Sequence, residues 1–164
     1  MKPLFTFLLL TLSFLSYGQF RNTTWGMTQQ QIIEAEGMVE YEIDDLDNYD
    51  PLERGLRTID QIVTIDSALV QISYMLENGK LTGGMYSFSP LNEEDKDAHN
   101  KLWKMTLSNL AKKYGKKYHM VGDSYNWNLP DLTIKAFNMD VGIAGGKLIN
   151  VIYDSVKVKQ EDIL

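Results

Sequence analysis

The feature that most constrains the fold is a pair of strand-like segments joined by Asn78-Gly79. In residues 69–76, apolar residues alternate with other residue types, as they do in a strand with one buried face. Residues 81–89 form a second segment of the same kind. Asn-Gly is the two-residue turn that best matches the twist of two antiparallel strands. The sequence therefore predicts a β-hairpin, and with it an antiparallel sheet, near the middle of the chain.

Two helices are predicted, each with recognisable ends. Thr28 and Gln31 have the spacing of a capping box, and Gly37 suits the end of that helix. A longer helix is expected to begin at Asn92 and to end at Gly115. Helical spacing predicts that its buried stripe comprises Trp103, Leu107, Leu110 and Tyr114, widened by Leu102 and Thr106.

The remaining segments complete a prediction of fold class. Residues 40–55 are acidic and predict a loop or a ragged edge strand. Further strands are expected at 59–66, 118–125, 132–139 and 148–158. We expect an α+β fold with an antiparallel sheet of about five to six strands and two helices on one face. The predicted order is α-β-β-β-α-β-β-β, which suggests a duplicated α-β-β-β unit.

Residues 1–18 have the three parts of a signal peptide. Lys2 supplies the positive charge, the apolar run from Leu4 to Leu15 follows, and Ser16-Tyr17-Gly18 has small residues where cleavage occurs. The run is too short for a membrane-spanning helix, which needs about 20 apolar residues. We therefore expect cleavage near Gly18 and a mature chain in the periplasm or outside the cell.

Composition limits what the mature chain does. Residues 19–164 are expected to form a single α+β domain, and because the chain has no cysteine, its core alone must hold it together. The net charge of the whole chain is −6, and losing Lys2 with the signal peptide makes it −7. Nucleic-acid binding depends on neutralising phosphates, so no nucleic acid is expected as a partner. We expect a monomer with no membrane span and no cofactor, whose partner is another envelope protein.

The residues Trp25-Gly26-Met27-Thr28 carry a resemblance to known proteins. They are similar to the start of small exported bacterial proteins, of the Bacteroidota type, in which Trp-Gly-Met-Ser/Thr leads into a short helix. The spacing of Gly26, Thr28, Gln31 and Ile32 also resembles the first helix of the β-lactamase-inhibitor-like and outer-membrane-assembly-lipoprotein folds. The chain lacks the lipidation cysteine of the lipoproteins. The resemblance implies binding to other proteins, and it carries no catalytic residues over.

Catalytic and metal sites have weak candidates. His99 and His119 are the two histidines, and neither lies beside a recognisable nucleophile motif. The oxygen-rich run from Asp44 to Asp50 lacks the glycine and glutamate that an EF-hand loop requires, so a solvated acidic loop is favoured over a calcium site. A carboxylate-dependent hydrolase would need acids such as Asp44 or Asp123 to converge in a cleft. This enzyme remains one alternative.

Two surfaces are the candidate binding sites. The weaker face of the strand 69–76 carries Gln71, Ser73 and Met75, and antiparallel sheets commonly leave one face in water. The second surface is a cluster of lysines at the end of the long helix: Lys112, Lys113, Lys116 and Lys117. Tyr125 and Trp127 are a further candidate, as a loop platform for a sugar or a peptide. We predict an exported binding module, with a structural envelope protein without a defined ligand as the other alternative.

Overall fold

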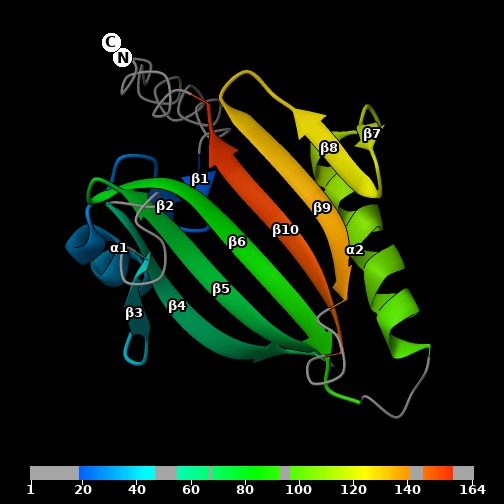
Figure 1. Cartoon of the computed structure of the whole chain (residues 1–164), viewed down its shortest axis with the longest axis horizontal. Coiled ribbons are helices and arrows are strands. Elements are labelled where there is room, and N and C mark those ends of the chain that lie inside the picture. Colours follow the sequence, from blue (N-terminus) through cyan, green and yellow to red (C-terminus); the bar gives the residue numbers. More distant parts are fainter. Residues whose placement is uncertain (1–18, 47–54, 67, 93–96, 141–145, 157–164) are drawn as a thin grey trace, which may run out of the picture.

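The computed structural model describes residues 19–46, 55–66, 68–92, 97–140 and 146–156. Most of this part of the chain forms one eight-stranded antiparallel sheet (Figure 1). In their order across the sheet, the strands are β3 (Glu42–Asp45), β4 (Leu56–Ile65), β5 (Ala68–Glu77), β6 (Lys80–Pro90), β10 (Lys147–Ser155), β9 (Leu132–Asp140), β8 (Ser124–Asn128) and β7 (His119–Val121). The other elements are the short strands β1 (Gln19–Phe20) and β2 (Thr23–Thr24), and the helices α1 (Gln29–Glu36) and α2 (Ala98–Tyr114).

The fold predicted from the sequence is therefore wrong. The sheet has eight strands instead of five or six, and the element order is not α-β-β-β-α-β-β-β. The acidic segment contributes a short edge strand, because charged side chains are tolerated where a strand faces water. The segment 118–125 folds as two strands, since Gly122 adopts a φ of 58° and turns the chain between them. The signal peptide predicted at residues 1–18 lies outside the described residues.

The two halves of the chain share one connectivity. In each half a helix is followed by four strands, α1-β3-β4-β5-β6 and α2-β7-β8-β9-β10. The fourth strands of the two halves pair with each other, from Gly83 with Asp154 to Phe88 with Ile149. The repeated unit is therefore α-β-β-β-β. The predicted unit has three strands, because the acidic segment predicts either a loop or a ragged edge strand and the segment 118–125 predicts one strand instead of two.

The predicted hairpin and the first helix are confirmed in detail. Asn78 and Gly79 both have positive φ, 50° and 74°, and they join β5 to β6. Thr28 accepts a hydrogen bond from the backbone N–H of Gln31, and Gln31 accepts one from the N–H of Thr28. Gly37 ends the helix with a left-handed conformation, φ 61°. These local patterns hold because they are satisfied by near neighbours in sequence.

One face of the sheet carries the core. On β5 this face presents Val70, Ile72, Tyr74 and Leu76, all of them buried. Both helices pack on it, because Arg57 on this face bonds Gln29 of α1 and Tyr125 on this face contacts Trp103 of α2. Figure 1 shows α2 behind β8 and β9, so the opposite, open face is turned toward the viewer.

Helix α2 is shorter than predicted, and its most buried positions differ from those expected. It begins at Ala98, with Asp97 at the cap position, so the expected start at Asn92 is wrong. Its buried residues are Leu102, Thr106 and Leu110. Trp103 and Leu107, which were expected at the centre of the stripe, are only half-buried. Both still pack against the core as partly buried residues. The buried Thr106 hydroxyl is satisfied within the helix, because it donates to the carbonyl of Leu102 at 2.9 Å.

The N-terminal strands are held to the core by Phe20. Its ring is 1% exposed and lies 5.0–5.4 Å from the ring centroids of Tyr74, Tyr86 and Tyr153. A Cβ atom on Gly84 would clash with the Phe20 ring. A glycine within a strand is typical of a bulge or of a close approach by another segment. At Gly84 the structure shows a close approach, because the missing side chain leaves space for an aromatic ring.

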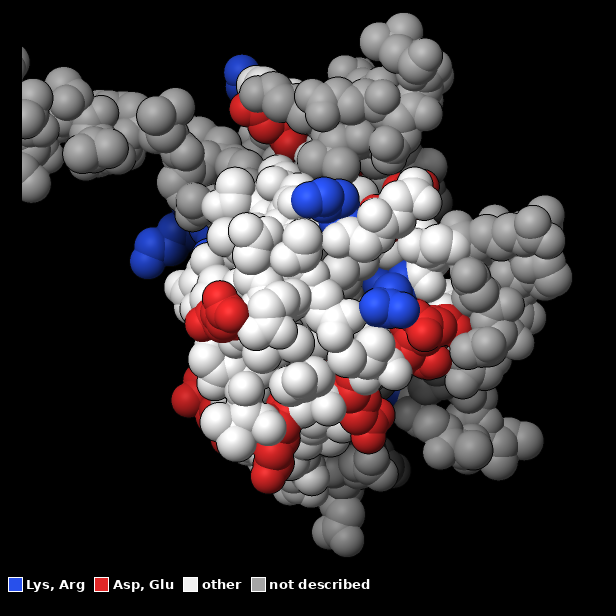
Figure 2. All heavy atoms as spheres, turned by 90° about the vertical axis from the view of Figure 1, so that its left-hand side faces the viewer, with Lys and Arg blue, Asp and Glu red and all other residues white. Residues whose placement is uncertain are grey.

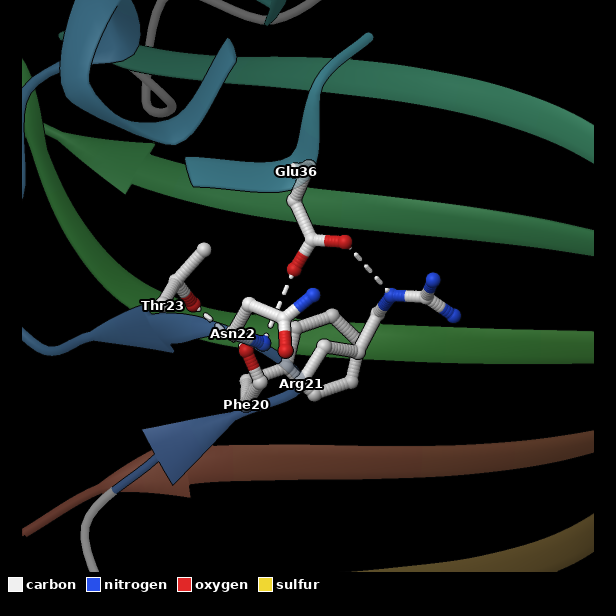
Figure 3. Close-up of polar contacts among 5 residues, drawn as sticks. All are labelled: Phe20, Arg21, Asn22, Thr23 and Glu36. Carbon is white, nitrogen blue, oxygen red and sulfur yellow. Dashed lines mark hydrogen bonds and ion pairs between the residues drawn. The ribbon is translucent and has the colours of Figure 1, made fainter. Parts of the chain in front are cut away.

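A buried carboxylate holds the turn that follows Phe20 (Figure 3). The Glu36 side chain at the end of α1 is 2% exposed and accepts hydrogen bonds from Arg21 Nε at 3.0 Å and from the backbone N–H of Asn22 at 2.9 Å. Arg21 has a positive φ of 58°, which is uncommon for a residue with a side chain. The carboxylate thus holds a strained turn in place, and we assign this ion pair a structural role.

We predict strong coupling between Phe20 and Gly84. Phe20→Ala should lower the free energy of unfolding by about 3–5 kcal/mol, because it empties a buried aromatic site. Gly84→Ala should lower it by about 1–3 kcal/mol through overpacking against the ring. In the double variant the methyl group added at position 84 enters the space that the Phe20 ring leaves, so the loss should be smaller than the sum. Urea denaturation of all four proteins measures this coupling.

The control is Asn22→Ala, in the same turn. Its side chain is exposed, and its backbone N–H still bonds Glu36 after the substitution. This variant should unfold at nearly the wild-type urea concentration. Additive losses for Phe20→Ala and Gly84→Ala would show that the two positions do not compete for one space.

Candidate functional site

The sheet residues predicted as a binding surface lie on the open face of β5. Gln71 is exposed, Met75 is half-buried, and Ser73 is buried although it points away from the helices. Gln71 Nε2 and the Ser73 hydroxyl both donate to Oδ1 of Asp60 on β4, the former at 3.1 Å. The Thr58 hydroxyl donates to the other oxygen at 2.6 Å. Asp60 therefore fixes a small polar network on the open face, and sequence analysis missed its role.

The outer edge of β4 is only partly covered. Strand β3 pairs with residues 57–60 of β4, and beyond Asp60 no described strand continues the pairing on that side. Residues 61–65, with the sequence Gln-Ile-Val-Thr-Ile, therefore form an open edge. Natural edge strands usually carry charges or proline that discourage further pairing, and this one carries neither.

A hollow of about 770 Å³ adjoins this open edge. We call it the edge hollow; it is lined by Val39, Glu40, Tyr41, Glu42, Asp60, Gln61, Ile62 and Gln71. Two of its apolar side chains are far more exposed than usual, Val39 at 90% and Ile62 at 66%. It combines exposed apolar groups with a strand edge that pairs with no other strand in the described part of the chain, and both features are typical of docking sites.

The edge hollow is acidic. Glu40, Glu42 and Asp60 line it, and none of its lining residues is lysine or arginine. Figure 2 views the molecule from the side of α1, β3 and β4 and shows acidic side chains, with a few basic ones, spread among large uncharged areas. Such a surface favours a partner of opposite charge. The sequence signal for it was present, since the acidic segment precedes an uncharged β-rich segment, but only the fold brings the two together.

The predicted lysine cluster lies elsewhere. Lys112 and Lys113 are in the last turn of α2, as predicted, and Lys116 and Lys117 follow it; all four are exposed. They belong to the layer of the helices, so they do not join Gln71, Ser73 and Met75 in one surface. Lys113 differs from its neighbours, because its Nζ lies 5.0 Å from the centroid of the Tyr114 ring.

The structure does not bring the proposed hydrolase residues together. Asp44 lies on β3 and Asp123 follows β7, and these strands form opposite edges of the sheet (Figure 1). Seven strand spacings of about 4.8 Å separate them, or about 34 Å along the sheet. His99 contacts Asn138 at 3.2 Å, and His119 lies on the exposed β7. These groups form no catalytic pair among the residues that the structure describes.

The oxygen-rich run from Asp44 to Asp50 was the candidate calcium site. Within the described ranges, no three acidic or histidine side chains gather where they would hold a metal ion; Asp47 and Asp50 lie outside those ranges.

Trp127 is buried, and its indole N–H donates to the carbonyl of Gly115 at 2.9 Å. Tyr125 contacts Trp103 and Tyr118. Both aromatics lie on the core face of a strand, so the prediction of a loop platform is wrong.

The tyrosines around Phe20 have altered acidity. Burial raises the pKa of Tyr74 and of Tyr153 well above the ordinary value of 10.0, and the negative charge of Glu36 adds to the effect on Tyr74. Burial also raises the pKa of Tyr86, although the nearby Arg21 and Lys113 oppose the shift. The Tyr74 hydroxyl is buried and has no well-formed hydrogen bond within the described part of the chain. The cluster is therefore a neutral core and not an acid–base centre at neutral pH.

Comparisons with known proteins identify no relative: a scan against protein-family models found no match, and a search of curated proteins found none. In the described ranges no helix is long and apolar enough to cross a membrane. The functional argument therefore depends on the geometry of the site.

We predict that stability falls in alkali because of these tyrosines. A raised pKa in the folded protein means that the neutral form is favoured, so the stability is fully present below pH 10, the ordinary pKa, and declines as pH rises above it. Tyr74→Phe removes a hydroxyl that makes no well-formed hydrogen bond, so stability at pH 7 should be unchanged or higher. Its decline above pH 10 should be shallower than in the wild type. Urea denaturation from neutral to alkaline pH tests both parts, and parallel curves for the two proteins would contradict the prediction.

Proposed function

We propose that the protein is an exported binding module that captures an extended, basic segment of another protein at the open edge of β4. The observation that carries the proposal is the uncharged, unpaired edge at residues 61–65 beside the acidic edge hollow. An added strand would bond its backbone to this edge and place alternate side chains toward the hollow. The resemblance to folds whose members bind other proteins supports the same reading.

Charge selects the partner. A second copy of this chain would bring its own Glu40, Glu42 and Asp60 against those already present, and like charges at short range are unfavourable. A segment in which lysine or arginine alternates with β-branched residues would instead place cations beside these carboxylates. Its apolar side chains would cover Val39 and Ile62, which are otherwise in water. We therefore propose a basic partner strand instead of self-association.

A displayed library of random ten-residue peptides tests this proposal. Peptides selected on the mature chain should be enriched in lysine and arginine and should bind more weakly as salt increases. Ile62→Lys should weaken the selected peptides at least tenfold, because it adds a positive charge at the edge. Amide hydrogen exchange should slow at residues 61–65 when a selected peptide is bound.

The matched control is Met139→Lys. Met139 is an apolar residue that is 40% exposed. It lies on the same open face as Ile62 but on β9, in the other half of the sheet. It should leave peptide affinity unchanged. Selection of neutral or acidic peptides, or equal weakening by both lysine substitutions, would reject the edge as the site. A concentration-dependent dimer that Ile62→Lys abolishes would assign the edge to self-association instead.

We also propose that the chain is exported and cleaved after Gly18. The proposal is supported by Lys2, the apolar run and the small residues at the cleavage position. Mass spectrometry of the protein made in a bacterium with two membranes should give a chain that starts at Gln19. A chain that keeps residues 1–18 in the cytoplasmic fraction would contradict export and would leave the peptide-binding proposal untouched.

A further inference from the structure

A second recess lies on the other face of the sheet, between α2 and strands β5, β6 and β10. We call it the helix groove; its volume is about 310 Å³, within the usual size range of small-molecule sites. Its walls are mostly apolar and include Val70, Phe88, Leu102, Leu110 and Val151. Helix α2 covers one part of this face, and Phe20 of the N-terminal strands covers another, over Tyr74 and Tyr153. The groove is the part of the face beside α2 that is left between them.

The two ends of the helix groove carry opposite charges. Asp66, at the turn after β4, lines one end together with Ala68, and Lys113 lines the other together with Tyr153. The wall of α2 runs from Leu102 to Lys113, which corresponds to about 16 Å of helix at about 1.5 Å per residue. The groove is therefore elongated, apolar along its length and cationic at one end.

We propose that the helix groove binds an amphipathic carboxylic acid, a medium-chain fatty acid, with its carboxylate at Lys113 and its alkyl chain along α2. The length and the apolar walls fit an unbranched chain. The carboxylate belongs at Lys113 because Asp66 would repel it from the opposite end. Lys113 lines this end of the groove together with Tyr86 and Tyr153.

This inference is independent of the proposed function. The helix groove lies under α2 on the core face of the sheet, and the edge hollow lies at the outer edge and open face of β4. The two recesses share no lining residue, although Ile65 at the end of the open edge lines the helix groove, so the tests use residues that belong to one site alone. Peptide binding and fatty-acid binding can therefore succeed or fail separately.

Calorimetric titration of the mature chain with decanoate, below its micelle concentration, tests the inference. Decanoate should bind with one site per chain, and decanol should bind at least tenfold more weakly, because it has no charge for Lys113. Lys113→Met should weaken decanoate about tenfold and leave decanol unchanged. Lys112→Met, one residue away in the same turn and not a lining residue, should change neither affinity.

A second pair of variants tests the location of the alkyl chain. Met105 is 50% exposed and lines the helix groove, so Met105→Trp should fill the groove at little cost to folding and should abolish decanoate binding. Lys104→Trp, on the exposed side of the same turn, is the control and should bind as the wild type does. Circular dichroism confirms that each variant is folded.

The inference is overturned by any of three results. Absence of decanoate binding to the wild type removes the site. Equal weakening by Lys113→Met and Lys112→Met shows a diffuse attraction of anions to the helix end. Normal binding by folded Met105→Trp shows that the fatty acid lies outside the helix groove.

Discussion

The pairing of β6 with β10 is the interaction on which the rest of the structure depends. It joins two four-stranded halves that otherwise have separate hairpin connections. Its register places Phe88 beside Ile149 and Tyr86 beside Val151, so the buried faces of both halves become one continuous core face. On the opposite face the Ser87 hydroxyl donates to Asn150 Oδ1 at 2.6 Å across the same junction. A shift of the β6–β10 register by one residue would turn the apolar side chains of one strand to the open face. The helix groove would then lose the sheet residues that line it, such as Val151.

Local patterns in the sequence were sufficient for part of this architecture. The capping box of Thr28 and Gln31 and the turn at Asn78-Gly79 were predicted and are present, because each is satisfied within a few residues. The junction of β6 and β10 could not be predicted in this way, since its partners lie far apart in sequence. The predicted strand count is too low at the two edges of the sheet, where the acidic segment predicts either a loop or an edge strand and 118–125 predicts one strand, because edge positions do not require apolar alternation.

For the candidate sites too, single residues were predictable from the sequence, whereas the grouping of residues that lie far apart in the chain was not. Gln71 and Lys113 were chosen from the sequence, and each lines a recess, but the recesses differ and lie on different faces. No pattern in the sequence indicates that Ile62 and Val39 line one recess. They do so because β3 begins only at Glu42, opposite Asp60, whereas β4 continues beyond Asp60 to Ile65. All six residues predicted for the stripe of α2 lie against the core, but the deepest positions are Leu102, Thr106 and Leu110, and Trp103 and Leu107 lie at its margin.

Under the export that we propose, the position of Phe20 determines the order in which the core is completed. Phe20 follows the predicted cleavage site almost directly, and its ring contacts Tyr153, which belongs to the last described strand. A chain exported from its N-terminus would deliver Phe20 well before Tyr153. The aromatic cluster would therefore close only after β10 has been delivered. On this proposal the N-terminal strands would become fixed to the core only when β10 arrives.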